Sequence, residues 1–469
     1  MSVYSAFQFL LQGSAAILLT VTLIPDATLA QTRCQTSVGG PDMLRPGEIP
    51  TMNANNGAPP PLTSGKNMSC PPSGENKSFR LAGVVSIGEG VRKSIHQEKI
   101  SSTKDDVSAI YAFDKAEVVL DALDVTTSGN ASSFENASFH GLNAGVLAAR
   151  GASVMIKGGT ITTTGAAANG AFAVDNGSRI ALKGVKVRAS GENAHGVMVA
   201  GGGVAIIENG DMSTTGSRSA VIATDRGGGE VTVRGGKYNT TGTTSPVLYS
   251  TGAIRVSDIK GTAETAEAIV VEGSNSASVS NSTLHSGRNG VMLYQSFSGD
   301  AKGIDGKLTI DGGEISVESG PLFYITNSRA DIRLTRVKLS GKSGDLITAS
   351  ADRWGLNGRN GGKVGVVAVD QKLLGRITAD DISDISLRLE GKSRFIGATK
   401  GNVSISIASG SSWTVTGDSH VEKLDVGGNL LERVLSKGHI VTYSTKLNQW
   451  AKGREIRLRD GGKLVPQMY

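Results

Sequence analysis

The residues of this sequence that are best suited to bind a ligand lie in one short loop. Asp352, Arg353 and Trp354 begin a run rich in Gly and Asn that ends at Gly362. An indole ring can stack on a sugar, and a neighbouring guanidinium can pair with a uronate or phosphate group. We therefore predict Arg353 and Trp354 as ligand-binding residues. The alternative is a packing role, in which Trp354 covers an exposed flank of the fold or caps it.

Acidic clusters and histidines are the other candidates for catalysis or metal binding. Two groups of three aspartates are close in sequence: Asp300, Asp305 and Asp311, and Asp380, Asp381 and Asp384. Both groups fit solvated surface charges better than an active site. The six histidines are scattered, without the spacing of metal ligands or of a general base: His96, His140, His195, His285, His420 and His439. The sequence therefore predicts no catalytic residue, no metal site and no cofactor.

Composition narrows the range of folds that could position these residues. Glycine accounts for 63 of the 469 residues, aromatic residues make up only 4% and hydrophobic residues 38%. This hydrophobic content, rich in Val and Ile, is too high for a disordered chain, and the glycines do not follow the triplet rule of collagen. Leu, Glu and Gln are too scarce for an α-solenoid or a coiled coil. Composition therefore favours an elongated all-β protein with many tight turns.

A repeat of alternating apolar residues around a short turn runs through the chain. Its clearest copies are VMIKGGTI from Val154, IALKGVKV from Ile180, VTVRGGKY from Val231 and LTIDGGEI from Leu308. Nine copies align, with spacings of 23 to 36 residues between their turn positions, two of which are Ala122 and Arg336. The other seven turn positions are residue types that tolerate a left-handed backbone: Gly158, Gly184, Asn209, Gly235, Asp258, Asn281 and Gly312. The two longest spacings hold insertions around residues 129–142 and 296–304.

Each repeat also contains a second apolar strand and a Thr-, Ser- and Gly-rich segment. Three short strands per unit of about 24 residues predict a right-handed parallel β-helix solenoid of roughly a dozen coils over residues 77–465, with a tail at 466–469. A β-sandwich would not need turn residues in register, a β-propeller needs about 40 residues per blade, and a left-handed β-helix would show hexapeptide repeats. Tyr249 and Tyr324 occupy equivalent repeat positions, which predicts an internal stack of rings.

The first 76 residues differ in composition from the repeats. An apolar run from Phe9 to Ile24 is typical of a secretory signal peptide over residues 1–30, with Thr28 and Ala30 as the small residues before a cleavage site after Ala30. A buried helix and an uncleaved anchor are the alternatives. Residues 31–76 form a Pro- and Asn-rich segment that we expect to be a disordered leader. Its two cysteines, Cys34 and Cys70, predict a disulfide in an exported chain, with two free thiols as the alternative.

The repeats resemble the right-handed β-helix proteins of the pectin-lyase-like superfamily, and more closely the passenger regions of bacterial autotransporters and related exported adhesins. The resemblance is strongest from about residue 245 to the end of the sequence and rests on SPVLYSTGAIRVSD from Ser245, ITASADRWGLNGRNGGKVGVVAVDQ from Ile347 and SGSSWTVTGDSHVEKL from Ser409. It implies a secreted or outer-membrane surface protein that acts as a non-enzymatic, adhesin-like binding scaffold. An autotransporter would continue into a membrane barrel, and the sequence departs from that pattern after its last repeat-like strand. We therefore expect either a separately encoded outer-membrane translocator as partner or a stand-alone secreted protein.

The same superfamily contains polysaccharide lyases and glycoside hydrolases, so an enzyme of this kind is the alternative. The paired aspartates followed by a Gly-His-Gly element that galacturonases of the superfamily carry are missing from this sequence. The expected partners are therefore host-cell, matrix or glycan ligands. The formal net charge is +6, but the basic residues are dispersed and form no run longer than two, so we expect no nucleic-acid partner.

Overall fold

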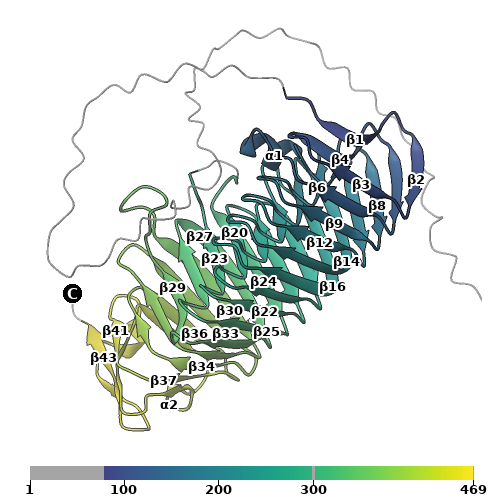
Figure 1. Ribbon diagram of the computed structural model, residues 1–469. Helices are drawn as coiled ribbons and strands as arrows, with labels where there is room; N and C mark the ends of the chain where they lie inside the picture. The colour runs from purple at the N-terminus through teal and green to yellow at the C-terminus, as the bar shows by residue number, and fades with distance from the viewer. Residues whose placement is uncertain (1–78, 298–300, 468–469) are drawn as a thin grey trace, which may run out of the picture. The chain divides into compact units, whose positions relative to one another are not determined.

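A computed structural model of the chain describes residues 79–297 and 301–467, and these residues form a parallel β-helix (Figure 1). This confirms the predicted all-β solenoid. The predicted signal peptide (1–30) and the leader (31–76) with Cys34 and Cys70 lie outside the described residues. None of the helices in the described ranges is long and apolar enough to cross a membrane.

One strand from each coil joins a 13-stranded sheet in which all strand pairs are parallel; we call it the first sheet. Its 13 strands confirm the predicted number of coils, roughly a dozen. In hydrogen-bonding order the strands are β1 (Ala82–Ile87), β4 (Val107–Ala112), β7 (Val146–Ala148), β10 (Ala171–Val174), β13 (Val197–Ala200), β15 (Ile222–Thr224), β17 (Leu248–Ser250), β20 (Ile269–Glu272), β23 (Val291–Tyr294), β26 (Phe323–Thr326), β29 (Asp345–Ala349), β32 (Arg376–Ala379) and β35 (Thr399–Lys400).

A 22-stranded parallel sheet, the second sheet, closes the coils and consists of two ladders. The first ladder contains β2 (Arg92–His96), β5 (Glu117–Asp121), β8 (Ser153–Lys157), β11 (Arg179–Lys183), β14 (Gly203–Thr214), β16 (Gly229–Thr240), β18 (Ala253–Ser257), β21 (Ser276–Ser280), β24 (Asp305–Asp311), β27 (Ser328–Thr335), β30 (Gly362–Val369), β33 (Asp384–Glu390), β36 (Val403–Ile407) and β39 (Lys423–Val426). The second ladder contains β3 (Lys99–Ser102), β6 (Asp124–Thr127), β9 (Thr160–Thr163), β12 (Lys186–Ala189), β19 (Lys260–Ala263), β22 (Thr283–Ser286), β25 (Glu314–Val317) and β28 (Lys338–Gly341). The long strands β14 and β16 pair in both ladders, which joins them into one sheet.

The C-terminal coils form two smaller sheets, and three short helices interrupt the strands. One sheet contains β31 (Lys372–Leu374), β34 (Arg394–Gly397), β37 (Ser412–Val415) and β40 (Val434–Leu435). The other contains β38 (Ser419–Val421), β41 (Ile440–Ser444), β43 (Lys463–Gln467) and β42 (Ile456–Arg457), and its β42–β43 pair is antiparallel. The helices are α1 (Phe134–His140), α2 (Leu430–Arg433) and the 3-10 helix η1 (Gln449–Ala451). Because β43 runs to Gln467, the strand extends into the predicted tail.

Successive side chains of each strand point alternately into the interior of the solenoid and outward, which decides which of them form the core. In β8, Val154 and Ile156 are buried, whereas Met155 between them is 42% exposed. In-register pairing then places Val154 between Val118 and Ile180 of the neighbouring coils. The interior is therefore a set of stacked aliphatic rows, each contributed by one position of the repeat.

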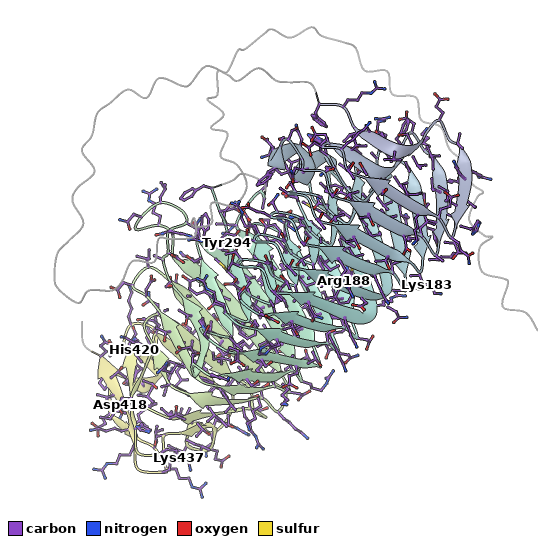
Figure 2. All side chains as sticks on the ribbon, viewed as in Figure 1. Lys183, Arg188, Tyr294, Asp418, His420 and Lys437 are labelled. Atoms are coloured by element: carbon purple, nitrogen blue, oxygen red, sulfur yellow. The ribbon has the colours of Figure 1, made fainter. Side chains whose placement is uncertain are left out.

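Charged side chains on the outer face of the second sheet pair from coil to coil. Figure 2 labels two of them, Lys183 and Arg188. The Arg188 guanidinium lies 2.9 Å from the Asp211 carboxylate of the next coil, and the Lys183 ammonium lies 3.9 Å from Glu208. Exposed pairs of this kind stabilise a fold only weakly, by up to about 1 kcal/mol each.

The nine turn positions of the repeat all have a left-handed backbone, with φ between 46° and 69°. Ala122 and Arg336 adopt this conformation as well as the Gly, Asn and Asp positions. A left-handed conformation costs a residue with a Cβ atom roughly 1–2 kcal/mol. The glycines at the corners therefore fall into two groups. Some are required only for their left-handed backbone, whereas others also have no room for a Cβ atom.

We expect Gly184→Ala to lower the free energy of unfolding by about 1 kcal/mol, because φ is +63° and nothing lies within 4 Å of an added Cβ. Gly159→Ala should cost clearly more, because φ is +83° and the added Cβ would lie 2.2 Å from the Leu123 carbonyl oxygen. Denaturant unfolding of the two variants measures both values. Equal losses would contradict the distinction between backbone strain and steric exclusion.

Candidate ligand-binding groove

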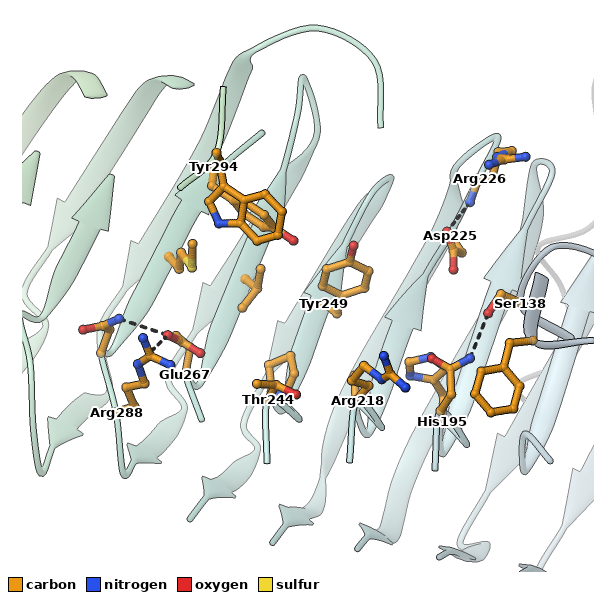
Figure 3. A pocket seen from close by; sticks show the side chains of 18 of the residues that line it. Ser138, His195, Arg218, Asp225, Arg226, Thr244, Tyr249, Glu267, Arg288 and Tyr294 are labelled. Atoms are coloured by element: carbon orange, nitrogen blue, oxygen red, sulfur yellow. Dashed lines mark hydrogen bonds and ion pairs between the residues drawn. The ribbon is translucent and has the colours of Figure 1, made fainter. Parts of the chain in front are cut away.

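The outer face of the first sheet carries apolar side chains that are separate from the interior core. Phe172 and Met198 belong to β10 and β13, whose residues are all buried, and they form a cluster with Leu147. Farther along the sheet, Val270 and Tyr294 form a second cluster. A groove of about 400 Å³ crosses the strands of this face, from α1 to the loop at residues 351–361 (Figure 3). We call it the groove.

The floor of the groove is one row of the repeat. Tyr249 of β17 is in register with Val270, Val270 with Met292, and Met292 with Tyr324. All four side chains line the groove. The sequence correctly predicts that Tyr249 and Tyr324 are equivalent, but the predicted internal stack is wrong, because this row faces outward and two other side chains separate the rings.

Helix α1 forms the wall at one end of the groove and lies in the predicted insertion at residues 129–142. The side chain of Ser133 caps its first turn by accepting a hydrogen bond from the Asn136 N–H (3.1 Å). The Arg226 guanidinium lies 3.8 Å from the centre of the Phe139 ring and 3.3 Å from the Glu135 carboxylate. These contacts fix the helix to a coil that is 91 residues away in sequence.

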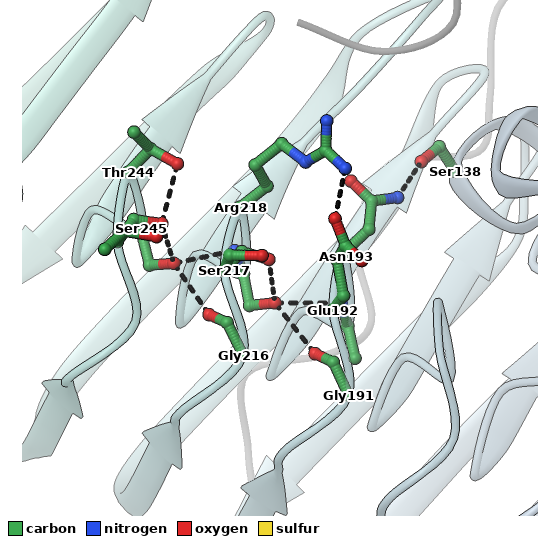
Figure 4. A network of polar contacts seen from close by, with 12 residues as sticks. Ser138, Gly191, Glu192, Asn193, Gly216, Ser217, Arg218, Thr244 and Ser245 are labelled. Carbon is green, nitrogen blue, oxygen red and sulfur yellow. Dashed lines mark hydrogen bonds and ion pairs between the residues drawn. The ribbon is translucent and has the colours of Figure 1, made fainter. Parts of the chain in front are cut away.

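A second contact to α1 comes from the coil corners beneath it (Figure 4). The Asn193 side-chain amide donates a hydrogen bond to the Ser138 hydroxyl (3.2 Å). Next to it, Arg218 forms an ion pair with Glu192. The Ser219 hydroxyl donates to the Gly191 carbonyl (3.1 Å), which ties the corner that carries Arg218 to the preceding coil.

The loop at residues 351–361 forms the opposite wall and contains both predicted ligand-binding residues. Trp354 is only 5% exposed, and its ring lies 5.4 Å from that of Tyr294, centre to centre. The Arg353 guanidinium lies 4.7 Å from the Trp354 ring centre. The Tyr324 hydroxyl donates to the Asp352 carboxylate (2.9 Å), which anchors the start of the loop. Trp354 therefore covers the outer face of the sheet and lines the groove at the same time, so both roles considered for it are compatible.

A buried carboxylate holds two rings at this end of the groove. Glu272 is fully buried and accepts hydrogen bonds from the hydroxyls of Tyr249 (2.6 Å) and Tyr294 (2.9 Å). The backbone N–H and the hydroxyl of Ser296 donate to the same carboxylate. Burial, and after it the negative charge of Glu272, holds the pKa of both tyrosines well above the usual value. Sequence reasoning missed Glu272; the available signal was its place at the end of the apolar strand EAIVVEG.

Most charged side chains of the groove are engaged by other side chains of the protein. Glu267 accepts a hydrogen bond from the Asn289 side-chain amide (2.9 Å) and lies 3.7 Å from the Arg288 guanidinium. The contacts of Glu135 and Asp352 are given above. The groove therefore presents carboxylates whose positions are set by internal partners.

His195 is the one histidine among the groove residues. It is 7% exposed, and its Nδ1 atom has no hydrogen-bond partner within the described residues. Burial lowers the pKa of His195 to about 4, an effect that a hydrogen bond with the Ala220 backbone partly offsets. The imidazole is therefore neutral near pH 7. Sequence reasoning grouped His195 with the scattered histidines, because nothing in its local pattern shows that it lies at the groove.

The aspartates of the two clusters that the structure describes do not line the groove. Asp300 lies outside the described residues. Asp305 pairs with Arg329 (2.6 Å) and Asp384 with Lys363 (3.7 Å) on the second sheet. Over residues 79–297 and 301–467, no group of three or more His, Cys, Asp or Glu side chains is arranged to hold a metal ion.

No protein-family model matches this sequence, and no curated protein is significantly similar to it.

We expect Tyr249→Phe to lower the free energy of unfolding by about 2 kcal/mol, because the buried Glu272 carboxylate loses one of its donors. Tyr324→Phe is the matched control, since its hydroxyl bonds to the exposed Asp352, and it should cost about 1 kcal/mol or less. Urea unfolding of both variants tests this. A larger loss in Tyr324→Phe would contradict the role assigned to Glu272.

The lowered pKa of His195 predicts a pH dependence of stability. The unfolded chain protonates this histidine near pH 6.5, whereas the folded protein does so only near pH 4. The contribution of neutral His195 to the free energy of unfolding is therefore fully present above pH 6.5 and is lost as the pH falls to 4. This loss lowers the free energy of unfolding by about 3 kcal/mol at most. His195→Gln should flatten the stability curve in this range compared with the wild type, and His96→Gln, which removes an exposed histidine, is the control. Parallel curves for His195→Gln and the wild type would contradict the prediction.

Proposed function

We propose that this protein is an exported, non-enzymatic binding scaffold of the adhesin type, and that its groove receives a glycan. The observation that carries the proposal is the row of Tyr249, Val270 and Met292, which offers an aromatic and apolar floor between two walls. Ligand sites are typically concave and mostly apolar, with a few fixed polar groups that orient the ligand. Trp354 and Arg353 supply such a combination at one wall.

The pairing of the acidic groups supports binding over turnover. Glycoside hydrolysis requires two carboxyl groups that flank the scissile bond, one as acid and one as base or nucleophile. In the groove, Glu267 is engaged by Arg288 and Asn289, and Asp352 by Tyr324. A polysaccharide lyase or glycoside hydrolase remains the alternative, and the test below distinguishes it by product formation.

The proposal includes the context that the sequence predicts. The chain would be exported through residues 1–30, displayed or released at the bacterial surface with a separately encoded outer-membrane translocator, and related to autotransporter passengers of the pectin-lyase-like type. The coiled repeat and the apolar N-terminal run support this context. Host-cell, matrix or glycan molecules would be its ligands.

The binding role is tested with the full exported chain on glycan and matrix arrays. We expect a subset of glycans to bind, and we expect Met292→Arg to abolish binding, because a long charged side chain would fill the floor of the groove. Met155→Arg is the matched control, an outward Met→Arg change on the second sheet, and should bind as the wild type does. Uniformly negative arrays would contradict the proposal, and sustained release of unsaturated products from polyuronides would establish the enzymatic alternative.

Export is tested by mass spectrometry of the protein recovered outside the cytoplasm. Cleavage after Ala30 predicts Gln31 as the new N-terminus. A disulfide between Cys34 and Cys70 predicts that neither thiol is alkylated before reduction. An intact N-terminus on the recovered protein would contradict the cleavage, and two alkylated cysteines would contradict the disulfide.

A further inference from the structure

The charge balance of the groove and two unpartnered polar atoms in its lining indicate which glycans it accepts. This inference rests on the proposed binding function. We propose that the ligand is an uncharged, hydroxyl-rich oligosaccharide that spans the groove from Trp354 to His195, and that acidic polysaccharides are poor ligands.

The side chains that line the groove carry no net charge. Four arginines and four carboxylates line it, and these are Arg218, Arg226, Arg288, Arg353, Glu135, Asp225, Glu267 and Asp352. Three of the arginines already lie beside a carboxylate of the protein, at Glu192, Glu135 and Glu267. An acidic ligand would have to displace these internal partners, and it would meet four carboxylates of like charge. The groove therefore lacks the surplus of positive charge that recognition of a polyanion requires.

Two polar atoms in the groove lining have no partner within the described part of the chain. They are Nε1 of Trp354 and Nδ1 of His195, on side chains that are more than nine-tenths buried. An indole N–H only donates, whereas a ring nitrogen of a neutral imidazole donates or accepts according to its tautomer. Because a hydroxyl group both donates and accepts, one hydroxyl can accept from the indole N–H and another can pair with the imidazole nitrogen in either tautomer. A carboxylate or sulfate only accepts, so it cannot satisfy an imidazole nitrogen that carries a lone pair.

The positions of these atoms call for an elongated ligand. His195 lies just before β13, and Trp354 packs on Tyr294 at the end of β23. Strands β13, β15, β17, β20 and β23 are successive neighbours in the first sheet, so the two sites are about 19 Å apart in the direction across the strands, at roughly 4.8 Å per strand, and they also lie at opposite ends of these strands. The apolar row between them suits the C–H faces of sugar rings. Figure 3 shows Tyr249 between the His195 end and the Tyr294 end.

Ligand binding should also move the two rings. Both nitrogen atoms have almost no accessible surface, so a hydroxyl reaches them only when the ring turns about its side-chain torsions. The chain has three tryptophans, and the other two lie elsewhere, Trp413 in the interior and Trp450 in η1. A change of tryptophan fluorescence that disappears in Trp354→Phe would therefore report binding at this wall.

The test uses the full chain and pairs of oligosaccharides with the same length, one neutral and one uronic-acid-containing, sialylated or sulfated. We expect the neutral member to bind more tightly, with an affinity that does not depend on salt between low and physiological ionic strength. Trp354→Phe keeps an aromatic ring, although a smaller one, and removes the N–H donor, and His195→Gln removes the imidazole; each should weaken binding about tenfold. Trp450→Phe is the matched control and should change nothing, and circular dichroism establishes that each variant is folded.

The outcomes separate this inference from the proposed function. Tighter, salt-dependent binding of the acidic members, still abolished by Met292→Arg, would overturn the inference and leave the groove as a glycan site. Neutral binding that is unchanged in both Trp354→Phe and His195→Gln would overturn the two contacts and with them the inference. Absence of any glycan binding would overturn the proposed function itself.

Discussion

The rest of this structure depends on parallel, in-register pairing between coils. Each coil exposes unpaired backbone groups along its edges and an apolar stripe that it cannot bury alone, so it is stable only against its neighbours. In-register pairing then repeats every side-chain position from coil to coil. The same constraint that stacks Val118, Val154 and Ile180 inside the solenoid places Tyr249, Val270, Met292 and Tyr324 in one row outside it. The floor of the groove is thus a consequence of how the fold is stabilised.

Segments that depart from the repeat supply the two walls of the groove. Helix α1 and the loop at residues 351–361 are free of the pairing constraint, so they must be held by side-chain contacts instead. Arg226 holds α1 through the Phe139 ring and the Glu135 carboxylate, and Tyr294 and Tyr324 hold the loop. A buried carboxylate needs hydrogen-bond donors, and Glu272 finds them where the hydroxyls of Tyr249 and Tyr294 meet. Without those donors its burial would be unfavourable.

Sequence reasoning succeeded where the information is local and repeated. The alternation of apolar residues, the turn residues and their spacing identify the β-helix, because each copy is subject to the same pairing. It failed for Tyr249 and Tyr324, because apolar strands such as β10 and β13 are buried on both faces and alternation no longer separates inside from outside. It also could not find the contact of Arg226 with α1, since 91 residues separate Arg226 from Glu135 and no pattern links them. His195 was missed for the same reason, because its neighbours in the groove come from other coils.

The engaged charges of the groove bear on how it can act. Rows of a parallel β-helix bring equivalent side chains within about 4.8 Å of one another, so like charges at one position of adjacent coils would repel. In the groove, Arg288 lies beside Glu267 and Arg226 beside Glu135, so opposite charges are paired and the side chains are fixed. Each such pair makes its arginine less available to a ligand anion and its carboxylate less available as a free acid or base. A groove assembled on stacked coils in this way is therefore better suited to recognising the shape and hydroxyl groups of a ligand than its charge.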